Sequence, residues 1–254
     1  MNENMELIKT SLLTKLQKEN LLKLVFSCCS HDSLNLSYPT EEEGCHYLLF
    51  HKNGHLASAL AFLPCGENVG ECTAFTNPEE RQNGYFSFLL EQALDDFCDF
   101  DFLFPVSGHC SDTEKTLQAL EAELESTEYQ MEGFTEPFSG FSALGYSLIP
   151  DFQNSSDEET TFVWNLLSSE NILLGTCLTT QTGRNSVCLH HVEIFPEYRQ
   201  KGYGTILMSL LCSALSKQSI SKVILQVSGS NQAALALYKK TGFCITQTLS
   251  FYLY

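Results

Sequence analysis

Apolar residues recur at two different periods in the first part of the chain. Between residues 5 and 30 the leucines follow the three- and four-residue spacing of an amphipathic helix, which predicts one or two helices. Two apolar runs follow, 46–52 and 55–64, and Asn53-Gly54 separates them. Asn-Gly between two apolar runs is typical of a β-hairpin turn. We therefore expect helix first and then a pair of antiparallel strands.

The rest of the first half alternates between helix-like and strand-like segments. A helix is predicted over 84–98, a short strand over 101–106 and a second helix over 112–128, where Glu, Leu and Ala dominate. The stretch 132–142 contains Gly133, Pro137, Ser139 and Gly140. Turn-forming residues at this density predict a domain boundary.

A second series of elements follows that boundary. The predicted strands are 160–167, 171–180, 186–195, 222–228 and the last eleven residues, 244–254, and the predicted helices are 202–217 and 231–241.

The two series share sequence as well as order. Residues 78–86 and 196–204 are identical at six of nine positions, at an offset of 118. Val106-Ser107-Gly108 returns as Val227-Ser228-Gly229, at an offset of 121. Two matches in the same order at nearly the same offset indicate an internal duplication. We expect two diverged copies of one fold, in residues 1–138 and 139–254.

Composition narrows the class of protein. Hydrophobic residues make up 43% of the 254 residues and charged residues 18%, which excludes general disorder. The net charge is −17, and residues 1–145 carry 24 acidic against 7 basic residues, whereas 146–254 carry 7 of each. Such an acidic chain is a poor nucleic-acid binder, because phosphate contacts need clustered Lys and Arg.

The cysteines and the apolar runs indicate the cellular compartment in which the protein is expected. The 11 cysteines are scattered and never form a C-x-x-C pair, which favours reduced thiols over disulfides. No apolar run approaches the roughly 20 residues of a membrane helix, and the charged N-terminal segment does not have the pattern of a signal peptide. We expect a cytoplasmic protein with no membrane or nucleic-acid partner.

One segment carries a recognisable chemistry. In residues 192–211 an apolar strand runs into Arg-Gln-Lys-Gly-Tyr-Gly, and a helix begins at once. The first amides of a helix lack internal partners and attract anions. Gly202 and Gly204 would let phosphates approach the backbone without a Cβ in the way. The alternative is an ordinary strand-to-helix turn that needs glycine.

These residues resemble the GNAT superfamily of acyl-CoA-dependent N-acyltransferases. Arg199 to Gly204 matches the family signature Q/R-x-x-G-x-G/A, and a second block, 225–243, follows with Asn231, Tyr238 and the closing Gly242-Phe243. The resemblance covers about residues 160–254. It implies an α/β (α+β) architecture of two tandem domains, each with a mixed, mostly antiparallel sheet flanked by helices.

The resemblance also implies a cofactor site and a catalytic acid. Acetyl-CoA would be the acyl donor, with no metal. The strand before the loop would pair with the pantetheine arm, and the loop amides would hold the pyrophosphate. Tyr238 would protonate the departing thiolate, for which a phenol of pKa near 10 is suited; the alternative is a tyrosine that only packs on the sheet. The implied cofactor-binding residues are Val192, Ile194, Arg199, Gln200, Lys201, Gly202, Tyr203, Gly204, Thr205 and Asn231.

The general base is open at this stage. Ribosomal-protein N-terminal acetyltransferases, which this segment resembles, often carry Glu where this chain has Gln226, and Gln does not accept a proton. Strict alternation along 186–195 would place Cys188, His190, Val192 and Ile194 on one face, and His191 and Glu193 on the other. His190 is the first candidate and Glu193 the second. The alternative is that these side chains are structural and that the amine loses its proton to water.

The first copy is expected to be degenerate. It has Phe86 where the second copy has Gly204, and His109 and Cys110 where Ser230 and Asn231 would be expected, with no tyrosine to serve as acid. The second copy is short at its start, so the first would shape or cover the substrate site. Its acidity, which includes Glu41-Glu42-Glu43, would favour a cationic acceptor.

Together these features predict an acetyl-CoA-dependent N-acetyltransferase. The acceptor would be a small amine or a peptide amine, and the active copy would be the C-terminal one, in a monomer or homodimer. The competing interpretation is a non-catalytic acyl-CoA-binding sensor or interaction module.

Overall fold

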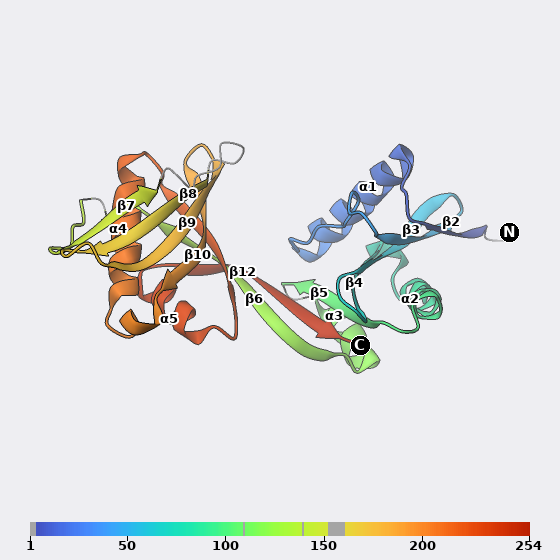
Figure 1. Ribbon diagram of the computed structural model, residues 1–254. Coiled ribbons are helices and arrows are strands. Elements are labelled where there is room, and N and C mark those ends of the chain that lie inside the picture. Colours follow the sequence, from blue (N-terminus) through green and yellow to red (C-terminus); the bar gives the residue numbers. More distant parts are fainter. Residues whose placement is uncertain (1–3, 109, 139, 152–160) are drawn as a thin grey trace. The chain divides into compact units, whose positions relative to one another are not determined.

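The chain divides into two compact units. The computed structural model describes residues 4–108, 110–138, 140–151 and 161–254; His109, Ser139 and Thr160, named in the expectations above, lie outside these ranges. Met1–Thr127 and Leu249–Tyr254 form the first unit, and Glu128–Thr248 form the second (Figure 1). The division falls inside a strand, earlier than the boundary predicted at 138/139, because that strand begins in one unit and ends in the other.

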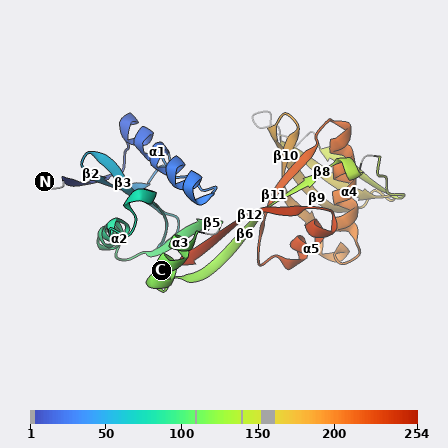
Figure 2. The ribbon, with the colours of Figure 1, turned by 180° about the vertical axis from the view of Figure 1, so that it is seen from behind.

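The first unit is a sheet with helices on both faces. The strand order is β1-β2-β3-β4-β5 followed by the end of β12. Helix α1 packs on one face of the sheet, while α2 and α3 pack on the other (Figure 2). The elements of this unit are β1 Met5–Thr10, α1 Lys15–Asp32, β2 His46–Lys52, β3 His55–Pro64, β4 Val69–Thr76, α2 Tyr85–Asp96, β5 Asp101–Ser107 and α3 Ser111–Leu120.

Local signals explain most of these elements. Asn53 and Gly54 both have positive φ, as the predicted hairpin turn requires, and they join β2 to β3. Thr14 and Gln17 form a capping box that starts α1. The prediction of helix from residue 5 was wrong, because Met5–Thr10 pair with β2. Leu7 and Ile8 pack into the cores on opposite faces of the sheet, which is strand geometry.

Two strands are divided between the units. Helix was predicted to residue 128, but α3 ends at Leu120, Glu121 adopts a left-handed conformation, and β6 runs from Glu123 to Phe134. Residues 128–134 of β6 pair with β11 of the second unit. Conversely, β12, Cys244–Leu253, begins in the second unit, and its residues 249–253 pair with β5 of the first. The first unit therefore takes a strand segment, residues 249–253, from the far end of the chain, whereas the second unit is the continuous stretch 128–248.

The second unit has one core. Its strand order is β12-β6-β11-β10-β9-β8-β7. Among its described residues, α4 and α5 are the α-helices, and both pack into the core that contains Trp164. The opposite face of the sheet is not covered by a described helix of this unit. The elements are β7 Tyr146–Asp151, β8 Thr161–Ser168, β9 Leu173–Gly183, β10 Ser186–Ile194, α4 Tyr203–Lys217, β11 Lys222–Ser228 and α5 Gln232–Lys240.

The architecture predicted from the sequence is confirmed. Both units have mixed sheets in which the strand pairs are antiparallel except for β4 with β5 and β10 with β11. These two parallel pairs occupy corresponding places in the two repeats, and in each the helix at the end of the duplicated nine-residue segment, α2 or α4, connects the two strands.

Candidate active site

A gap opens between β10 and β11 in the second unit. The two strands pair in parallel from Ser186 with Lys222 to Leu189 with Leu225, and then the ladder ends. Beyond that point β10 stays paired with β9, and β11 stays paired with β6. The facing backbone edges of residues 190–194 and 226–228 therefore have no strand partner across the gap. Such edges can hydrogen-bond an extended ligand.

A β-bulge lies where the gap begins. His190 pairs with Leu178 and Glu193 with Thr176, so the two intervening residues face a single residue of β9, and His191 has φ of 51°. The extra residue reverses the side-chain alternation. Glu193 comes to the face of His190, while Val192 and Ile194 pack toward the core. The face assignment made from strict alternation was therefore wrong for all three.

His190 is held in a chain of hydrogen bonds on the uncovered face. Its Nε2 lies 2.8 Å from Thr180 Oγ1, which lies 2.7 Å from Thr161 Oγ1. Its Nδ1 lies 3.0 Å from Nδ1 of His191. One of these two Nδ1 atoms must donate and the other accept, so both rings cannot be protonated in this arrangement. At least one imidazole is neutral here, which is the state of a general base.

The loop before α4 exposes backbone amides. Gln200 has φ of 60° and Gly202 φ of 84°, so the backbone turns twice through the left-handed region before the helix begins at Tyr203. No side chain caps α4, and the amides of Thr205 and Ile206 bond only to Gly202 O. The amides of Tyr203 and Gly204 have no partner in the described structure. This is the anion-binding geometry of a helix N-terminus.

The two glycines of the loop have different roles. A Cβ on Gly202 would meet nothing within 4 Å, so that glycine serves the positive φ. A Cβ on Gly204 would lie 3.1 Å from Leu237 Cδ2 of α5. Gly204 therefore allows α4 and α5 to pack closely, a role that the sequence did not indicate. A bulky residue at 204 would disturb helix packing as well as ligand binding.

The charged side chains of the loop turn back onto the protein. Arg199 donates from Nε to Ile194 O at 2.8 Å, and its guanidinium lies 3.6 Å from Glu193 Oε1. Lys201 donates to Glu197 O at 3.0 Å. Arg199 thus ties the loop to the end of β10. Its ion pair with Glu193 leaves that carboxylate less suited than His190 to be the base.

Tyr238 lies on the other side of the sheet from His190. Its side chain is buried in the core under α4 and α5, where its ring lies 5.9 Å from that of Phe243. Burial, with a smaller effect from Cys177, raises the pKa of Tyr238 to about 12. Asn231 caps α5 through Oδ1, which accepts from Ala234 N at 3.1 Å. A candidate acid and a candidate base therefore flank the strands on opposite faces.

The first unit repeats the loop but not the site. Gln82 and Gly84 have φ of 64° and 79°, and Arg81 Nε donates to Thr76 O, the counterpart of the Arg199 bond to Ile194. However, β4 pairs with β3 without a bulge. Phe86 replaces the small residue at the helix start and packs against the core.

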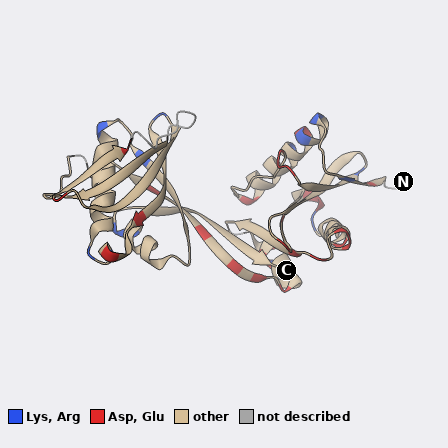
Figure 3. Cartoon of the chain, in the orientation of Figure 1, with Lys and Arg blue, Asp and Glu red and all other residues tan. Residues whose placement is uncertain are grey.

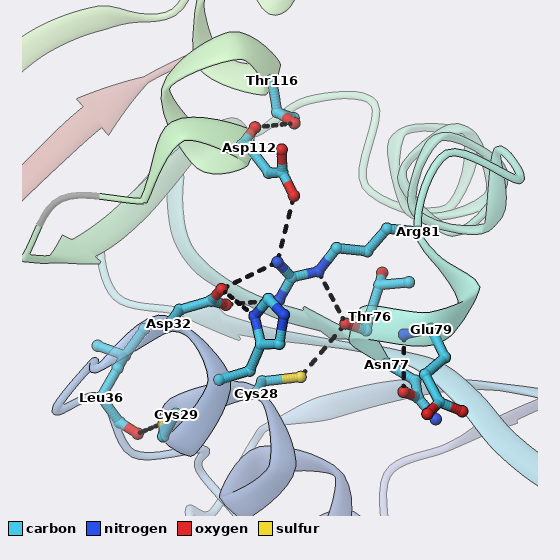
Figure 4. A network of polar contacts seen from close by, with 11 residues as sticks. Cys28, Cys29, Asp32, Leu36, Thr76, Asn77, Glu79, Arg81, Asp112 and Thr116 are labelled. Carbon is cyan, nitrogen blue, oxygen red and sulfur yellow. Dashed lines mark hydrogen bonds and ion pairs between the residues drawn. The ribbon is translucent and has the colours of Figure 1, made fainter.

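Arg81 is also engaged differently from Arg199. Its guanidinium bonds both oxygens of Asp32 and lies 3.3 Å from Asp112, as Figure 4 shows. The side chain of Asp32 is only 8% exposed, and the Arg81 hydrogen bond holds the pKa of that carboxyl below its usual value. Two carboxylates thus lie beside this arginine in the first unit, where the second unit has an exposed guanidinium.

Sequence reasoning found the loop, Tyr238 and His190, but missed the groups that hold His190. Counting back through the hairpin from the Gly183–Ser186 pair would have set Gln181, and not Thr180, opposite Cys188, because the register shifts by one residue after Ser186. The bulge left no recognisable signal. Within the ranges described, no three His, Cys, Asp or Glu side chains gather as metal ligands, and none of the helices is long and apolar enough to cross a membrane.

Part of the chain, including this site, is similar to a known protein family. Residues 121–243 match the model of the acetyltransferase (GNAT) family. The second unit is therefore similar to proteins of the GNAT family. The matched segment begins beside β6, the strand that completes the sheet of the second unit, and ends at Phe243, so it covers the gap, the bulge and the loop.

A curated relative also matches part of this chain. Over 79 residues the chain is 30% identical to the [ribosomal protein bS18]-alanine N-acetyltransferase of Escherichia coli (strain K12), a match that covers 31% of this chain and 53% of the relative. The chain thus spans about half the length of the curated relatives it matches.

Two solved structures share the fold over nearly the whole chain. A GCN5-related N-acetyltransferase from Sphaerobacter thermophilus superposes with a TM-score of 0.72 at 12% identity, covering 98% of this chain and 95% of that one. A tandem GNAT protein from the clavulanic acid biosynthesis pathway superposes with a TM-score of 0.69 at 13% identity, covering 99% and 98%. At these identities the likeness shows the fold alone, and that fold is tandem.

Proposed function

We propose that the second unit is an acetyl-CoA-dependent N-acetyltransferase that acts on a primary amine. The observation that carries the proposal is the bulge in β10, which coincides with the diverging strands and the uncapped start of α4. The first repeat has diverging strands and a similar loop, but no bulge and no equivalent of Tyr238. Bulges next to a site re-aim backbone and side chains toward a ligand.

The residues of the second unit fit the cofactor in a definite way. The backbone of Val192 and Ile194 would pair with the amide arm, and the amides of the 200–205 loop would hold the pyrophosphate. Arg199 fixes that loop to β10, and Asn231 keeps its amide nitrogen available while Oδ1 caps α5. The uncovered face of the sheet, with His190, would receive the amine.

The reaction needs two proton movements. The amine nitrogen attacks the thioester carbonyl carbon, the carbon–sulfur bond breaks, the nitrogen loses a proton and the sulfur gains one. The amine takes the place of His191 at Nδ1 of His190, which accepts the proton, while Nε2 stays bonded to Thr180 Oγ1. Tyr238 donates to the sulfur. Because its pKa of about 12 lies above that of an ordinary thiol at about 8.5, Tyr238 stabilises the developing thiolate as a hydrogen-bond donor, and the released thiolate takes its proton from water.

Tyr238→Phe tests the assignment of the donor. The ring and its packing remain, so we expect a fold and a KM close to wild type, with kcat lower by about 100-fold. Because burial raises the pKa of Tyr238 to about 12, the phenol stays protonated, and its ionisation should cause no loss of rate below about pH 10. Steady-state rates across pH would measure both. Undiminished turnover in the variant would remove Tyr238 from the mechanism.

His190→Gln tests the assignment of the base. We expect kcat/KM to fall by about 100-fold and its acidic limb to disappear, because the group that must be neutral is gone. Cys188→Ser is the matched control, since Cys188 lies on the same face of β10 and should be nearly neutral. If both variants keep the wild-type pH profile, the amine loses its proton to water and His190 is structural.

A non-catalytic acyl-CoA-binding module is the second candidate. It is favoured by Gln226, which has no proton-accepting group, and by the high pKa of Tyr238. The two candidates differ in the fate of the bound thioester. A module would bind acetyl-CoA and leave it intact with any amine, whereas the enzyme would release the thiol only when an amine is present.

The class of acceptor follows from two observations. The matched relative is named for an alanine N-acetyltransferase activity on a ribosomal protein, which makes peptide N-termini the first acceptors to examine. The acidic first half favours a cationic acceptor. Short peptides with a free N-terminal alanine and basic residues satisfy both.

A further inference from the structure

The hydrogen-bond chain at His190 spans three neighbouring strands of the second unit. Thr161 of β8 stands directly opposite Thr180 of β9, and their Oγ1 atoms lie 2.7 Å apart. His190 of β10 is paired with Leu178, two residues along β9 from Thr180, and its Nε2 lies 2.8 Å from Thr180 Oγ1. An aromatic side chain can reach a diagonal neighbour of this kind. Thr180 is therefore the link between Thr161 and the imidazole.

The other ring nitrogen of His190 faces His191. Neighbouring side chains of a regular strand point to opposite faces, but His191 has φ of 51° in the bulge, and the two rings lie 5.2 Å apart. Their Nδ1 atoms lie 3.0 Å apart, so one of them donates and the other accepts. When both rings are neutral, a change of tautomer at His190 therefore requires the opposite change at His191.

The two hydroxyls decide which nitrogen of His190 carries the proton. A hydroxyl donates one hydrogen bond and can accept another at the same time. If Thr180 donates to Thr161, it accepts from Nε2–H of His190, and Nδ1 keeps the lone pair that the amine needs. If Thr161 donates to Thr180, the chain reverses, and Nδ1 carries the proton. Only the first direction is compatible with protonation at Nδ1, because an imidazolium donates from both nitrogens.

The strands that carry these hydroxyls are uncharged. Neither Thr161–Ser168 of β8 nor Leu173–Gly183 of β9 contains an acidic or basic residue (Figure 3). A carboxylate or a backbone carbonyl often fixes the tautomer of a histidine. Here a pair of half-buried hydroxyls stands at Nε2 in that position.

We propose that Thr161 is a positioning residue that sets the tautomer of His190 through Thr180. By accepting the proton of Thr180, Thr161 keeps Nε2 of His190 a donor and Nδ1 an acceptor, although it does not touch the ring itself. This role rests on the proposed function, in which Nδ1 of His190 accepts the proton of the amine. His191 holds that nitrogen by donating to it until the amine takes its place.

Thr161→Val tests this assignment, because it removes the hydroxyl and nearly keeps the shape of the side chain. Without its acceptor, the Thr180 proton turns to Nε2, since a half-buried donor left unbonded is costly. We expect His190 to change from Nε2–H to Nδ1–H, His191 to change in the opposite sense, and kcat/KM to fall about tenfold.

Nitrogen NMR of the full chain with isotope-labelled histidine reports the tautomers directly. The spectra would be recorded without acetyl-CoA or amine at about pH 9, where histidine is ordinarily neutral. The signals of His190 are assigned by their loss in His190→Gln. Wild-type His190 protonated on Nδ1, or an unchanged tautomer in Thr161→Val, would overturn the proposal.

Two further variants separate this role from a structural one. Thr161→Ser restores the hydroxyl and should keep the wild-type tautomers and rate. Thr176→Val removes a hydroxyl from the same face of β9, where it donates to Trp164 O, and should change neither tautomer. A switch in Thr176→Val as well would show that any loss of a hydroxyl from this face disturbs the rings, and would contradict a specific role of Thr161.

The tautomer is read without substrate, so this proposal and the proposed function fail separately. A switch in Thr161→Val, in a protein whose wild type transfers no acetyl group, would support the role of Thr161 in setting the tautomer and contradict the proposed function. Turnover by the wild type with no switch in Thr161→Val would contradict the role of Thr161 and leave the proposed function standing.

Discussion

Thr205→Glu should abolish acetyl-CoA binding while leaving the fold intact. Thr205 lies in the first turn of α4, where a carboxylate stabilises the helix through its dipole. The same carboxylate would lie within a few ångströms of the pyrophosphate and repel it by about 3 kcal/mol, or about 100-fold in Kd. Isothermal titration of acetyl-CoA would measure the loss.

The internal duplication supplies a matched control for this variant. Ser87 stands at the corresponding place of α2 in the first repeat, at the same offset of 118. Ser87→Glu carries the same change of charge in the same first turn and should leave acetyl-CoA affinity unchanged. If Ser87→Glu abolishes binding and Thr205→Glu does not, the first unit holds the cofactor and the assignment of the two copies is reversed. Thr205→Gln enlarges the side chain without adding a charge, so its effect on acetyl-CoA affinity distinguishes the role of charge from that of size.

Deletion of residues 249–254 should unfold the first unit and spare the second. These six residues supply the partner strand of β5, and Tyr252 packs into the core beneath α2 and α3. Tyr254 exchanges two backbone hydrogen bonds with Phe102, at 2.9 and 3.0 Å. Their loss costs about 5 kcal/mol or more, which is comparable with the whole stability of a small domain.

Two optical signals would separate the units in that experiment. Trp164, the chain's single tryptophan, lies in the core of the second unit and reports on it alone. In urea, far-UV circular dichroism should show a large early loss, while the Trp164 transition stays close to wild type. Ser250→Ala, on the same strand, should change neither. A truncated chain that unfolds in one transition at the wild-type midpoint would show that β12 is dispensable for the first unit.

Local chemistry made much of the fold predictable. The Asn53-Gly54 turn, the α2 and α4 helices and the strand β11 all carry their own signals, and each lies within a few residues of its predicted place. The duplicated segment gave the tandem architecture. The missed strand β1 has apolar neighbours that suit either period, and it pairs with β2, which lies some 40 residues further along the chain. The missed strands β4 and β7 pair with the neighbouring strands β3 and β8, but both are partly polar.

The exchange of strands could not be seen in the sequence. A boundary rich in Gly and Pro at 132–142 marks where β6 ends, not where the unit ends. Several strand edges have similar hydrophobic patterns. No local feature of the sequence indicates that β5 pairs with residues 249–253. As a result, the sheet of the first unit is completed by residues 249–253, more than 120 residues after the rest of that unit ends.

The candidate site was predictable in its parts but not in its arrangement. The loop and Tyr238 follow from motif and spacing. The position of His190 relative to Glu193 depends on one extra residue in β10, and a bulge moves every later side chain to the other face. The divergent roles of Gly202 and Gly204 likewise needed the position of Leu237, which belongs to another helix.

Amine-dependent release of the CoA thiol tests the central claim most directly. The full chain would be incubated with acetyl-CoA and a peptide bearing a free N-terminal alanine and basic residues, with thiol and acetylated peptide both quantified. The account predicts equal amounts of the two products for wild type and Ser87→Glu, and about 100-fold less of both for Thr205→Glu at acetyl-CoA concentrations below the wild-type Kd. Bound acetyl-CoA that stays intact in wild type with every amine offered, or transfer that is undiminished in Thr205→Glu, would contradict it.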